Sequence, residues 1–569
     1  MTLAIRKFAI KNAIDYGKAD AGSVLGKVIP QARGIPVPEL KKEVQKIVGE
    51  INSLKKNALE KEYAPFKEEF EKRAEETVKK TEKPKLVLEG AEMGKVATRI
   101  PPGPNGYLHI GHMKQAVLSS ELAKMYDGKF FRYFDDTNPE KDRQEYVDAM
   151  IRDHEWMGFK FAKTYYASDM VDKIYDYAKQ LIKIKKAYVC GCSREEIKEK
   201  RFAGKQCKHR KQGVEDNMAL FEGMLNGKIK QGAAIVRFMG DMKAANTVLR
   251  DPALLRIIET PHYRQGTKYR VWPVYDFNTP IVDSLQGVTD VLRSKEFELR
   301  GELGRQILGA LGLRVPRIHE FSRLNINGNV TAKRIIRKLI AEGQLKSWDD
   351  PRLMTLMALR RRGIRPEAIA NFIMKIGMTK SENNLPFEML LAENRKVIDP
   401  IAKHLFFVAN PVRLTVLGAR KLDAHLRLHP GADFGFRDYE TGEAFYISKD
   451  DADQIKKGAI LRLKDLVDVK IKKVEKNGIV ADMHEDIGGK DSRIIQWVPE
   501  DNHVECTVQV IGPLLDENEN VDPNSLQTVS GYVESYAEKL DEHEIVQFER
   551  FGYCILDDKK NMRFIFISK

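Results

Sequence analysis

The sequence contains 569 residues, and 96 Lys and Arg against 82 Asp and Glu give it a formal net charge of +14. This length exceeds what one hydrophobic core supports and predicts about three to five domains. No run of about 18 apolar residues occurs, which excludes a membrane-spanning helix, and five cysteines are too few for a disulfide scaffold. Because no secretory signal is recognised, we expect a cytoplasmic protein. The basic excess favours a polyanionic partner, although a merely basic surface would carry the same charge.

Residues 1–85 are predicted to form a small, highly charged helical domain. Its apolar residues recur at helical spacing in the run Leu40, Val44, Ile47, Val48, Ile51 and Leu54. Packing against the rest of the protein is the simplest interpretation of such a domain. Lys79–Lys85 is predicted to be a charged linker.

A strand, a tight loop and a helix are predicted in that order over residues 96–120. The β-rich run ends at Pro101–Gly106, and helix-forming residues follow. Backbone N–H groups and the N-terminus of the helix then lie where an anion can bind. His109 and His112 share one face near that N-terminus, and Gly111 lets a flat ring or a phosphate approach the backbone.

The segment His109-Ile110-Gly111-His112 resembles the signature of class I aminoacyl-tRNA synthetases, and Pro101–Tyr107 before it is similar to the glutamyl/glutaminyl branch. The resemblance implies that both imidazoles contact ATP, used with Mg²⁺, and stabilise charge on its phosphates while an aminoacyl-adenylate forms. Further contacts implied by this segment are Pro102, Asn105 and Gly111 for ATP and Arg99 for the amino acid. Gly103 departs from the Glu that is usual in this branch, so any contact by that carboxylate is missing.

A second strand, Lys129–Phe134, ends at two carboxylates, Asp135 and Asp136. Alternating strands and helices indicate a parallel α/β sheet, whose first half we assign to residues 86–169. Carboxylates at the carboxyl end of such a strand face the ligand crevice, although these two could instead cap the next helix. The match to the family's Phe-Asp-Asp-Thr-Asn-Pro implies that Asp135 binds the ammonium group of the amino acid.

An inserted domain is predicted over residues 170–262, and it contains a candidate metal site. Cys190-x-Cys192 is followed by Cys207-x-His209, and two such pairs can surround Zn²⁺ tetrahedrally. Buried cysteines without a metal are the alternative. A similar knuckle occurs in the acceptor-end insertion of some glutamyl-tRNA synthetases. We therefore interpret Cys190, Cys192, Cys207 and His209 as ligands of one structural zinc ion.

The α/β pattern returns over residues 263–340 with a segment similar to the amino-acid pocket of this branch. The resemblance implies that Tyr275 places the substrate and that Arg293 lies at the end of the substrate's side chain. Glutaminyl enzymes carry a small uncharged residue at the position of Arg293 and a Gln at that of Ile318, so both positions favour glutamate. The alternative is that Arg293 forms an ion pair with Asp290 or Glu296.

The segment that ends at Lys333-Arg334 fits the second class I signature, a mobile basic loop that clamps the ATP triphosphate. A flexible lysine suits this task because it can follow the charge as pyrophosphate leaves. The resemblance implies that Arg323, ten residues before Lys333, also helps to bind the phosphates of ATP. Ala332 replaces the usual Ser and Ile335 a common Lys, so we expect the clamp to survive with one hydrogen bond fewer.

The last two regions are predicted to bind tRNA. Residues 341–395 are expected to be helical, and Arg360-Arg361-Arg362 implies phosphate contacts, with a solvated face as the alternative. Short alternating runs over residues 396–569 indicate β-barrels. Glu544–Tyr553 resembles the anticodon-binding barrel of glutaminyl and archaeal-type glutamyl enzymes. Residues 1–85 weakly resemble helical appendages that touch tRNA.

The expected fold is therefore α/β and multidomain: a Rossmann-type class I catalytic domain, an inserted acceptor-binding domain, helical segments and C-terminal all-β anticodon-binding barrels. The resemblance to archaeal-type glutamyl-tRNA synthetases implies an enzyme that activates glutamate with ATP and transfers it to tRNA-Glu, with tRNA-Gln open as a second substrate. Because we recognise no dimer seam in the sequence, we expect a monomer. One alternative is a glutaminyl-tRNA synthetase. Another is a tRNA-binding protein that has lost catalysis, which the departures at Gly103 and Ala332 make conceivable.

Overall fold

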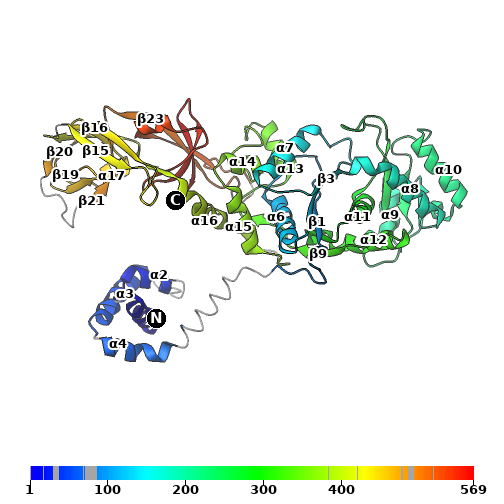
Figure 1. Ribbon diagram of the computed structural model, residues 1–569, viewed down its shortest axis with the longest axis horizontal. Coiled ribbons are helices and arrows are strands. Elements are labelled where there is room, and N and C mark those ends of the chain that lie inside the picture. Colours follow the sequence, from blue (N-terminus) through cyan, green and yellow to red (C-terminus); the bar gives the residue numbers. More distant parts are fainter. Residues whose placement is uncertain are drawn as a thin grey trace. The chain divides into compact units, whose positions relative to one another are not determined.

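The computed structural model describes two compact units of the chain, residues 1–85 and 86–569 (Figure 1). The described residues are 2–16, 18–29, 37–54, 56–67, 70, 86–381, 384–419, 421–475, 478–484, 493–516, 518 and 520–569. The expected linker Lys79–Lys85 lies outside them. Within these ranges, no helix has the length and apolar character needed to cross a membrane.

The first unit consists of helices around a small apolar core. They are α1 (Thr2–Tyr16), α2 (Ala21–Val28), α3 (Val37–Asn52) and α4 (Lys56–Tyr63). The apolar run predicted from Leu40 falls in α3, where Leu40, Val44 and Ile51 are buried. The turn between α1 and α2 is fixed by two side-chain amides, because Asn12 Oδ1 accepts from Asp20 N and Asn52 Oδ1 accepts from Ala19 N, each at 2.7 Å.

The catalytic sheet of the second unit is parallel. Its strands and covering helices are β1 (Ala97–Ile100), β2 (Lys129–Phe134), β3 (Lys163–Tyr166), β8 (Asp290–Ser294), β9 (Arg317–Phe321), α6 (Ile110–Met125), α7 (Gln144–Trp156) and α12 (Glu298–Ala310). β1, β2 and β3 pair in that order, and β8 pairs with β9. Thr289 N, at the start of β8, donates to Ala97 O of β1 at 2.9 Å. The strands that follow β1 in the chain are therefore added on one side of it (β2, β3) and later ones on the other side (β8, β9). Parallel sheets of this type form their ligand crevice at the point where the strand order switches in this way.

An antiparallel sheet interrupts this parallel one. It has the order β4-β5-β6-β7 and is covered by helices. The elements are α8 (Val171–Lys183), β4 (Ala187–Cys190), α9 (Arg194–Phe202), α10 (Val214–Leu225), β5 (Ile235–Phe238), β6 (Ala253–Ile257), β7 (Val271–Pro273) and α11 (Tyr275–Leu285). The sheet extends to Pro273, beyond the boundary expected at residue 262. Since α11 begins two residues after β7, this sheet delivers Tyr275 to the crevice.

Short helices follow the catalytic sheet. The elements are β10 (Asn325–Ile326), α13 (Lys333–Ala341), α14 (Leu356–Arg361), α15 (Pro366–Ile376), β11 (Asn384–Leu385) and α16 (Glu388–Ile398). The three consecutive arginines differ from one another. Arg360 is exposed, whereas Arg361 pairs with Asp557 at 2.7 Å and Arg362 is buried against the ring of Phe387. The three arginines therefore do not form one solvated face.

The described residues of the C-terminal region form mainly β-strands, together with the short helix α17 (Lys449–Ala452) and a 3₁₀ helix at Ser535–Lys539. Two seven-stranded sheets curl into barrel-like shapes, in the orders β12-β25-β26-β27-β23-β24-β13 and β21-β18-β19-β20-β14-β17-β22, and β15-β16 forms a hairpin. The strands are β12 (Lys403–Leu405), β13 (Phe407–Ala409), β14 (Val412–Leu417), β15 (Leu422–Arg427), β16 (Phe436–Thr441), β17 (Ala444–Ile447), β18 (Ile460–Leu463), β19 (Val467–Glu475), β20 (Gly478–His484), β21 (Arg493–Ile495), β22 (Val498–Pro499), β23 (His503–Ile511), β24 (Leu526–Glu534), β25 (Ile545–Phe548), β26 (Gly552–Asp558) and β27 (Arg563–Ser568).

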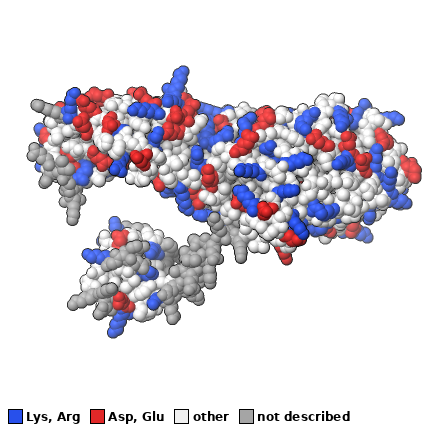
Figure 2. All heavy atoms as spheres, in the orientation of Figure 1, with Lys and Arg blue, Asp and Glu red and all other residues white. Residues whose placement is uncertain are grey.

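One hydrophobic core joins the catalytic sheet to the nearer barrel. It contains Met113 and Leu118 of α6, Phe372 of α15, Ile555 of β26 and Ile567 of β27. Over the visible face of this unit, Lys and Arg side chains are interspersed with Asp and Glu (Figure 2). The predicted fold class, an α/β catalytic region followed by curled all-β sheets, is confirmed.

Candidate active site and metal centre

A cavity of about 360 Å³ opens at the carboxyl ends of β1, β8 and β9. It gathers residues from segments more than 200 positions apart in the sequence. Of the residues singled out from the sequence, its lining contains Pro102, Asn105, His109, Gly111, His112, Tyr275, Arg293, Arg323 and Lys333. Arg99 lines a smaller adjoining cavity together with Tyr275 and Arg293. Arg334 is exposed and lies outside the lining of either cavity.

The two histidines are locked at the N-terminus of α6. His109 is the N-cap residue, and its Nδ1 accepts from Gly111 N at 3.1 Å, while His112 Nδ1 accepts from His109 N at 3.1 Å. Burial lowers the pKa of His109 to about 4 and the pKa of His112 well below its ordinary value, so both rings are neutral. A neutral imidazole that accepts at Nδ1 carries its proton on Nε2, which leaves Nε2–H as a donor. The helix N-terminus thus presents two further donors for an anion.

The conformation of the His109 side chain requires glycine at position 111. A Cβ on Gly111 would lie 2.8 Å from Cε1 and 2.9 Å from Nδ1 of His109. Only glycine therefore lets the ring turn back over the first turn of the helix. This explains the glycine of the signature by local packing in addition to its closeness to a ligand.

Lys333, the first residue of α13, reaches back to the loop after β1. Its Nζ donates to Asn105 Oδ1 at 2.7 Å, and a Cβ on Gly106 would lie 2.7 Å from its Cδ. Burial lowers the pKa of Lys333 to about 8. Asn105 also occupies the space beside Gly103, since its Nδ2 lies 2.9 Å from where a Cβ of residue 103 would stand. In this chain the amide of Asn105 thus fills the space beside Gly103, the position at which the branch usually has Glu.

Asp135 and Asp136 have different partners. Asp135 Oδ1 accepts from Asn278 Nδ2 at 3.0 Å, and burial raises the pKa of Asp135 to about 6. Asp136 accepts from the backbone N and the hydroxyl of Ser168, each at 2.8 Å. The helix-capping alternative is wrong, because α7 begins at Gln144 with Arg143 as its N-cap residue and without a side-chain capping hydrogen bond.

Arg99 forms a bidentate ion pair with a carboxylate that the sequence did not indicate. Its Nε and Nη2 donate to the two oxygens of Asp283 at 2.9 and 2.8 Å, and both side chains are buried. A bidentate pair of this kind fixes the guanidinium plane and neutralises its charge. The positive charge of Arg99 is therefore balanced before any substrate binds.

Arg293 is only loosely paired. Its Nη2 lies 3.5 Å from Glu320 Oε1, directly opposite on β9, and the side chain is 11% exposed. Its Nε is buried with no hydrogen-bond partner among the described residues. The two ion pairs considered from the sequence do not form, because Asp290 binds Arg317 at 2.7 Å and Glu296 binds Arg323 at 3.2 Å. The pocket thus contains one buried guanidinium whose charge is weakly matched.

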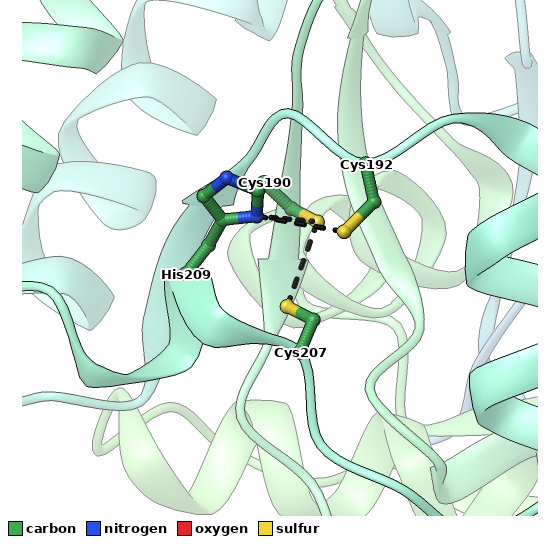
Figure 3. A group of neighbouring side chains, drawn as sticks. All are labelled: Cys190, Cys192, Cys207 and His209. Carbon is green, nitrogen blue, oxygen red and sulfur yellow. Dashed lines mark hydrogen bonds between the residues drawn. The ribbon is translucent and has the colours of Figure 1, made fainter.

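The cysteine and histidine pairs meet in one cluster (Figure 3). The distances are 3.8 Å between the sulfurs of Cys190 and Cys207, and 3.7 and 3.5 Å from His209 Nδ1 to the sulfurs of Cys190 and Cys192. A tetrahedron with Zn–S bonds of about 2.3 Å and a Zn–N bond of about 2.05 Å has S–S edges of about 3.8 Å and S–N edges of about 3.6 Å. The donor set and its spacing therefore fit a zinc ion.

Donors also surround the sulfurs from outside the cluster. Arg237 Nη1 lies 3.7 Å from Cys190 Sγ, and Lys200 Nζ lies 3.6 Å from Cys192 Sγ. Two cations next to three thiolates offset the excess negative charge that a centre with three sulfurs carries. Such outer contacts are typical of built metal sites.

Sequence reasoning missed the residues that hold the pocket in place. They are Asn278 and Asp283 on α11 and Glu320 on β9. Asn278 lies three positions after Tyr275, on the same face of the helix, and Asp283 lies about two turns after Tyr275. Glu320 could have been found from the register of β8 and β9, which places Glu320 opposite Arg293.

Comparison with known proteins agrees with this geometry. Residues 95–400 match the family model of the tRNA synthetases class I (E and Q), catalytic domain, and residues 402–487 and 494–557 match two models of the anti-codon binding domain of the same class. Three similar relatives are glutamate–tRNA ligases. That of Nitrosopumilus maritimus is 44% identical over 98% of both chains. Those of Thermococcus kodakarensis (97% of this chain, 96% of the relative) and Pyrococcus furiosus (99% and 98%) are each 40% identical.

Proposed function

We infer that the protein is a glutamate–tRNA ligase, because the chain belongs to the class I tRNA synthetases of the glutamate and glutamine type. Members of this class use ATP, typically with Mg²⁺. The observation that carries the choice of glutamate is Arg293, whose guanidinium is only loosely paired with Glu320 at 3.5 Å and whose Nε and Nη2 have no hydrogen-bond partner among the described residues. A carboxylate at the tip of the substrate completes its hydrogen bonding.

The reaction proceeds in two displacements. A carboxylate oxygen of glutamate attacks the α-phosphorus of ATP, the bond to the bridging oxygen breaks, and pyrophosphate leaves with the electron pair. A ribose hydroxyl at the 3′ end of tRNA then attacks the carbonyl carbon, and AMP leaves. The Nε2–H groups of His109 and His112 and the Nζ of Lys333 are assigned to the phosphate charge that develops in the first step. Arg323 assists from the rim, and Arg334 joins only if the loop moves inward.

The amino acid is held at both ends. Asp135 accepts from its ammonium group, and the buried Oδ1 of Asn278, which has no partner among the described residues, offers a second acceptor there. Tyr275 lies between the two cavities and packs along the substrate. Arg99, fixed by Asp283, contributes its remaining N–H groups, and Arg293 meets the side-chain carboxylate.

The regions outside the catalytic sheet are assigned to tRNA. We place the acceptor end on the insertion 170–262, continued by its sheet to Pro273, the stem on 341–395 and the anticodon on 396–569. Residues 1–85 are an appendage that also contacts tRNA. We propose that the protein acts as a monomer.

Separate aminoacylation of tRNA-Glu and tRNA-Gln with each amino acid tests the proposed function. We expect glutamate to be attached to tRNA-Glu with a preference over glutamine of roughly 10⁴-fold or more, as pockets built on polar matching achieve. Equal use of glutamine would favour the glutaminyl alternative. ATP–pyrophosphate exchange, run with tRNA present, addresses the tRNA-binding alternative, for which no exchange is expected. The tRNA-Gln arm decides whether that tRNA is a second substrate.

We also propose that Cys190, Cys192, Cys207 and His209 hold one structural zinc ion, which would tie β4 to the segment after α9. Purified protein is expected to contain about one zinc per chain, and Cys190→Ala to lose it. Cys506→Ala is the matched control, since Cys506 is a buried cysteine of the barrel outside the cluster. Protein without zinc whose clustered thiols react freely while it is folded would overturn this assignment.

A further inference from the structure

Helix α12 contains three glycines, of which Gly301 has an unusual neighbour. Glycine inside a helix is destabilising relative to alanine, so such a position calls for a reason. A Cβ on Gly309 would have no described atom within 4 Å, and a Cβ on Gly304 would lie 3.3 Å from Cγ of Pro280. A Cβ on Gly301 would lie only 2.4 Å from Nη2 of Arg293 and 3.6 Å from its Cζ. Gly301 is thus the glycine against which the guanidinium rests.

Residues of β9 also lie next to the guanidinium and to Gly301. Glu320 Oε1 lies 3.5 Å from Nη2 of Arg293, and Ile318 Cδ1 lies 3.5 Å from the point where a Cβ of Gly301 would stand. Lys380 Nζ lies 3.8 Å from the other oxygen of Glu320, which reduces the charge that Glu320 offers to Arg293. The guanidinium therefore occupies a slot between the backbone of α12 and β9. Its depth in the pocket is set by how closely it can approach the helix.

We propose that Gly301 is a positioning residue for the amino-acid specificity of the enzyme, because it fixes how deeply the guanidinium of Arg293 sits. This inference rests on the proposed function, in which Arg293 meets the side-chain carboxylate of glutamate. An ordinary contact to a Cβ begins near 3.4 Å, so a methyl group at residue 301 requires Nη2 of Arg293 to move away from the helix by about 1 Å. The displaced atom is the end of a flexible side chain, so the helix keeps its place and the guanidinium moves.

A shift of this size disrupts the bidentate pairing between the guanidinium of Arg293 and the side-chain carboxylate of glutamate. Two parallel N–H···O bonds need both nitrogens at about 2.7–2.9 Å from the carboxylate oxygens. A guanidinium displaced by about 1 Å crowds the carboxylate or meets it through one nitrogen, and misplacement of this size in a site can cost about 10²-fold. ATP is assigned to the signature residues His109, His112 and Lys333 of the larger cavity, and none of these contacts Gly301, so we expect little change in the KM for ATP.

Two alanine substitutions in the same helix test the proposal. Gly301→Ala is expected to raise the KM for glutamate about 10- to 100-fold, with the KM values for ATP and tRNA within about 2-fold of wild type. The preference for glutamate over glutamine falls with it. Gly309→Ala makes the same chemical change in open space and keeps wild-type kinetics. Wild-type KM and selectivity in Gly301→Ala would overturn the proposal.

The double variant separates this inference from the proposed function. If Gly301 acts through Arg293, then Gly301→Ala changes nothing further in an Arg293→Ala background. An equal increase in KM in that background would mean that Gly301 acts by another route. If Arg293→Ala alone leaves glutamate binding unchanged, the assignment of the pocket fails instead. Should Gly301→Ala alone be unstable, the double variant regains stability because its clashing partner is gone, and failure of both to fold contradicts the proposal.

Discussion

Replacing His112 or Lys333 by alanine is expected to lower tRNA-dependent ATP–pyrophosphate exchange by at least about 10²-fold. The reason is that each supplies a fixed donor where charge develops on the phosphates, and the loss of one such donor typically costs 10²–10³-fold in rate. His112 is buried and neutral, with its proton on Nε2, and Lys333 reaches over the same cavity from α13. Exchange rates at saturating glutamate and tRNA measure the effect directly.

A control variant distinguishes this role from one in stability. Lys338→Ala, in the same helix as Lys333, removes an exposed lysine that lies 3.7 Å from Glu342, and it should leave exchange unchanged. His112 also accepts from the backbone of His109, so His112→Ala loses about 1 kcal/mol of helix capping, which thermal unfolding will report. Near-normal exchange in both variants would mean that the two signatures are relics.

The pH profile offers a second readout of Lys333. Burial lowers its pKa to about 8 in the free enzyme, so its positive charge is present below pH 8 and is lost as the pH rises through that value. The ratio kcat/KM for ATP reports groups of the free enzyme. It should therefore fall above pH 8, and Lys333→Arg should remove that decline, because a guanidinium keeps its proton in this range.

The sequence indicated the residues that carry chemistry because their patterns are local. The pair His109 and His112 with Gly111 between them lies within one helical turn, and its role follows from that spacing. The partners that orient the site come from distant segments. Asp283 lies 184 positions after Arg99, and Asn278 lies 143 positions after Asp135. Contacts of this kind are made only by the tertiary fold, so Arg99 could not be seen to be neutralised in advance.

Some misses could have been avoided from strand geometry alone. Asp290 and Arg293 lie three positions apart on β8, and alternating side chains of a strand put such residues on opposite faces. Asp290 therefore meets Arg317 and Arg293 meets Glu320, each directly across the parallel pair. The antiparallel sheet of the insertion could not be delimited in the same way, because β7 (Val271–Pro273) is short and reads equally well as part of the next segment.

Replacing Arg293 by cysteine is expected to raise the KM for glutamate by about 10²-fold or more while the KM for ATP changes only a few-fold. Truncating one partner of a buried charge pair costs about 2–5 kcal/mol, and here the other partner is the substrate's own carboxylate. Burial already lowers the pKa of Arg293, which shows that the protein holds this charge in a poorly solvated place. The carboxylate of the substrate would offset the desolvation of the Arg293 charge, because bulk water has little access to this guanidinium.

The competing explanation is that Arg293 serves only to pair with Glu320. Arg317→Ala is the matched control, because Arg317 lies on the same two strands and pairs with Asp290. We expect Arg317→Ala to reduce the thermal stability without changing the ratio of KM values, and Arg293→Cys to change that ratio. A purely structural Arg293 would give the same pattern as Arg317.

The identity of the amino acid follows from hydrogen-bond chemistry at Arg293. Glutamate and glutamine have nearly the same shape, so the pocket must distinguish a group with acceptors only from one that also donates. A guanidinium has donors only, and the amide of glutamine turns an NH₂ group toward it, leaving buried donors unpaired on both sides. Cysteine at this position removes the conflict and the charge together. Arg293→Cys should therefore weaken the use of glutamate far more than the use of glutamine. A wild-type enzyme that used both amino acids equally would contradict the pocket assignment itself.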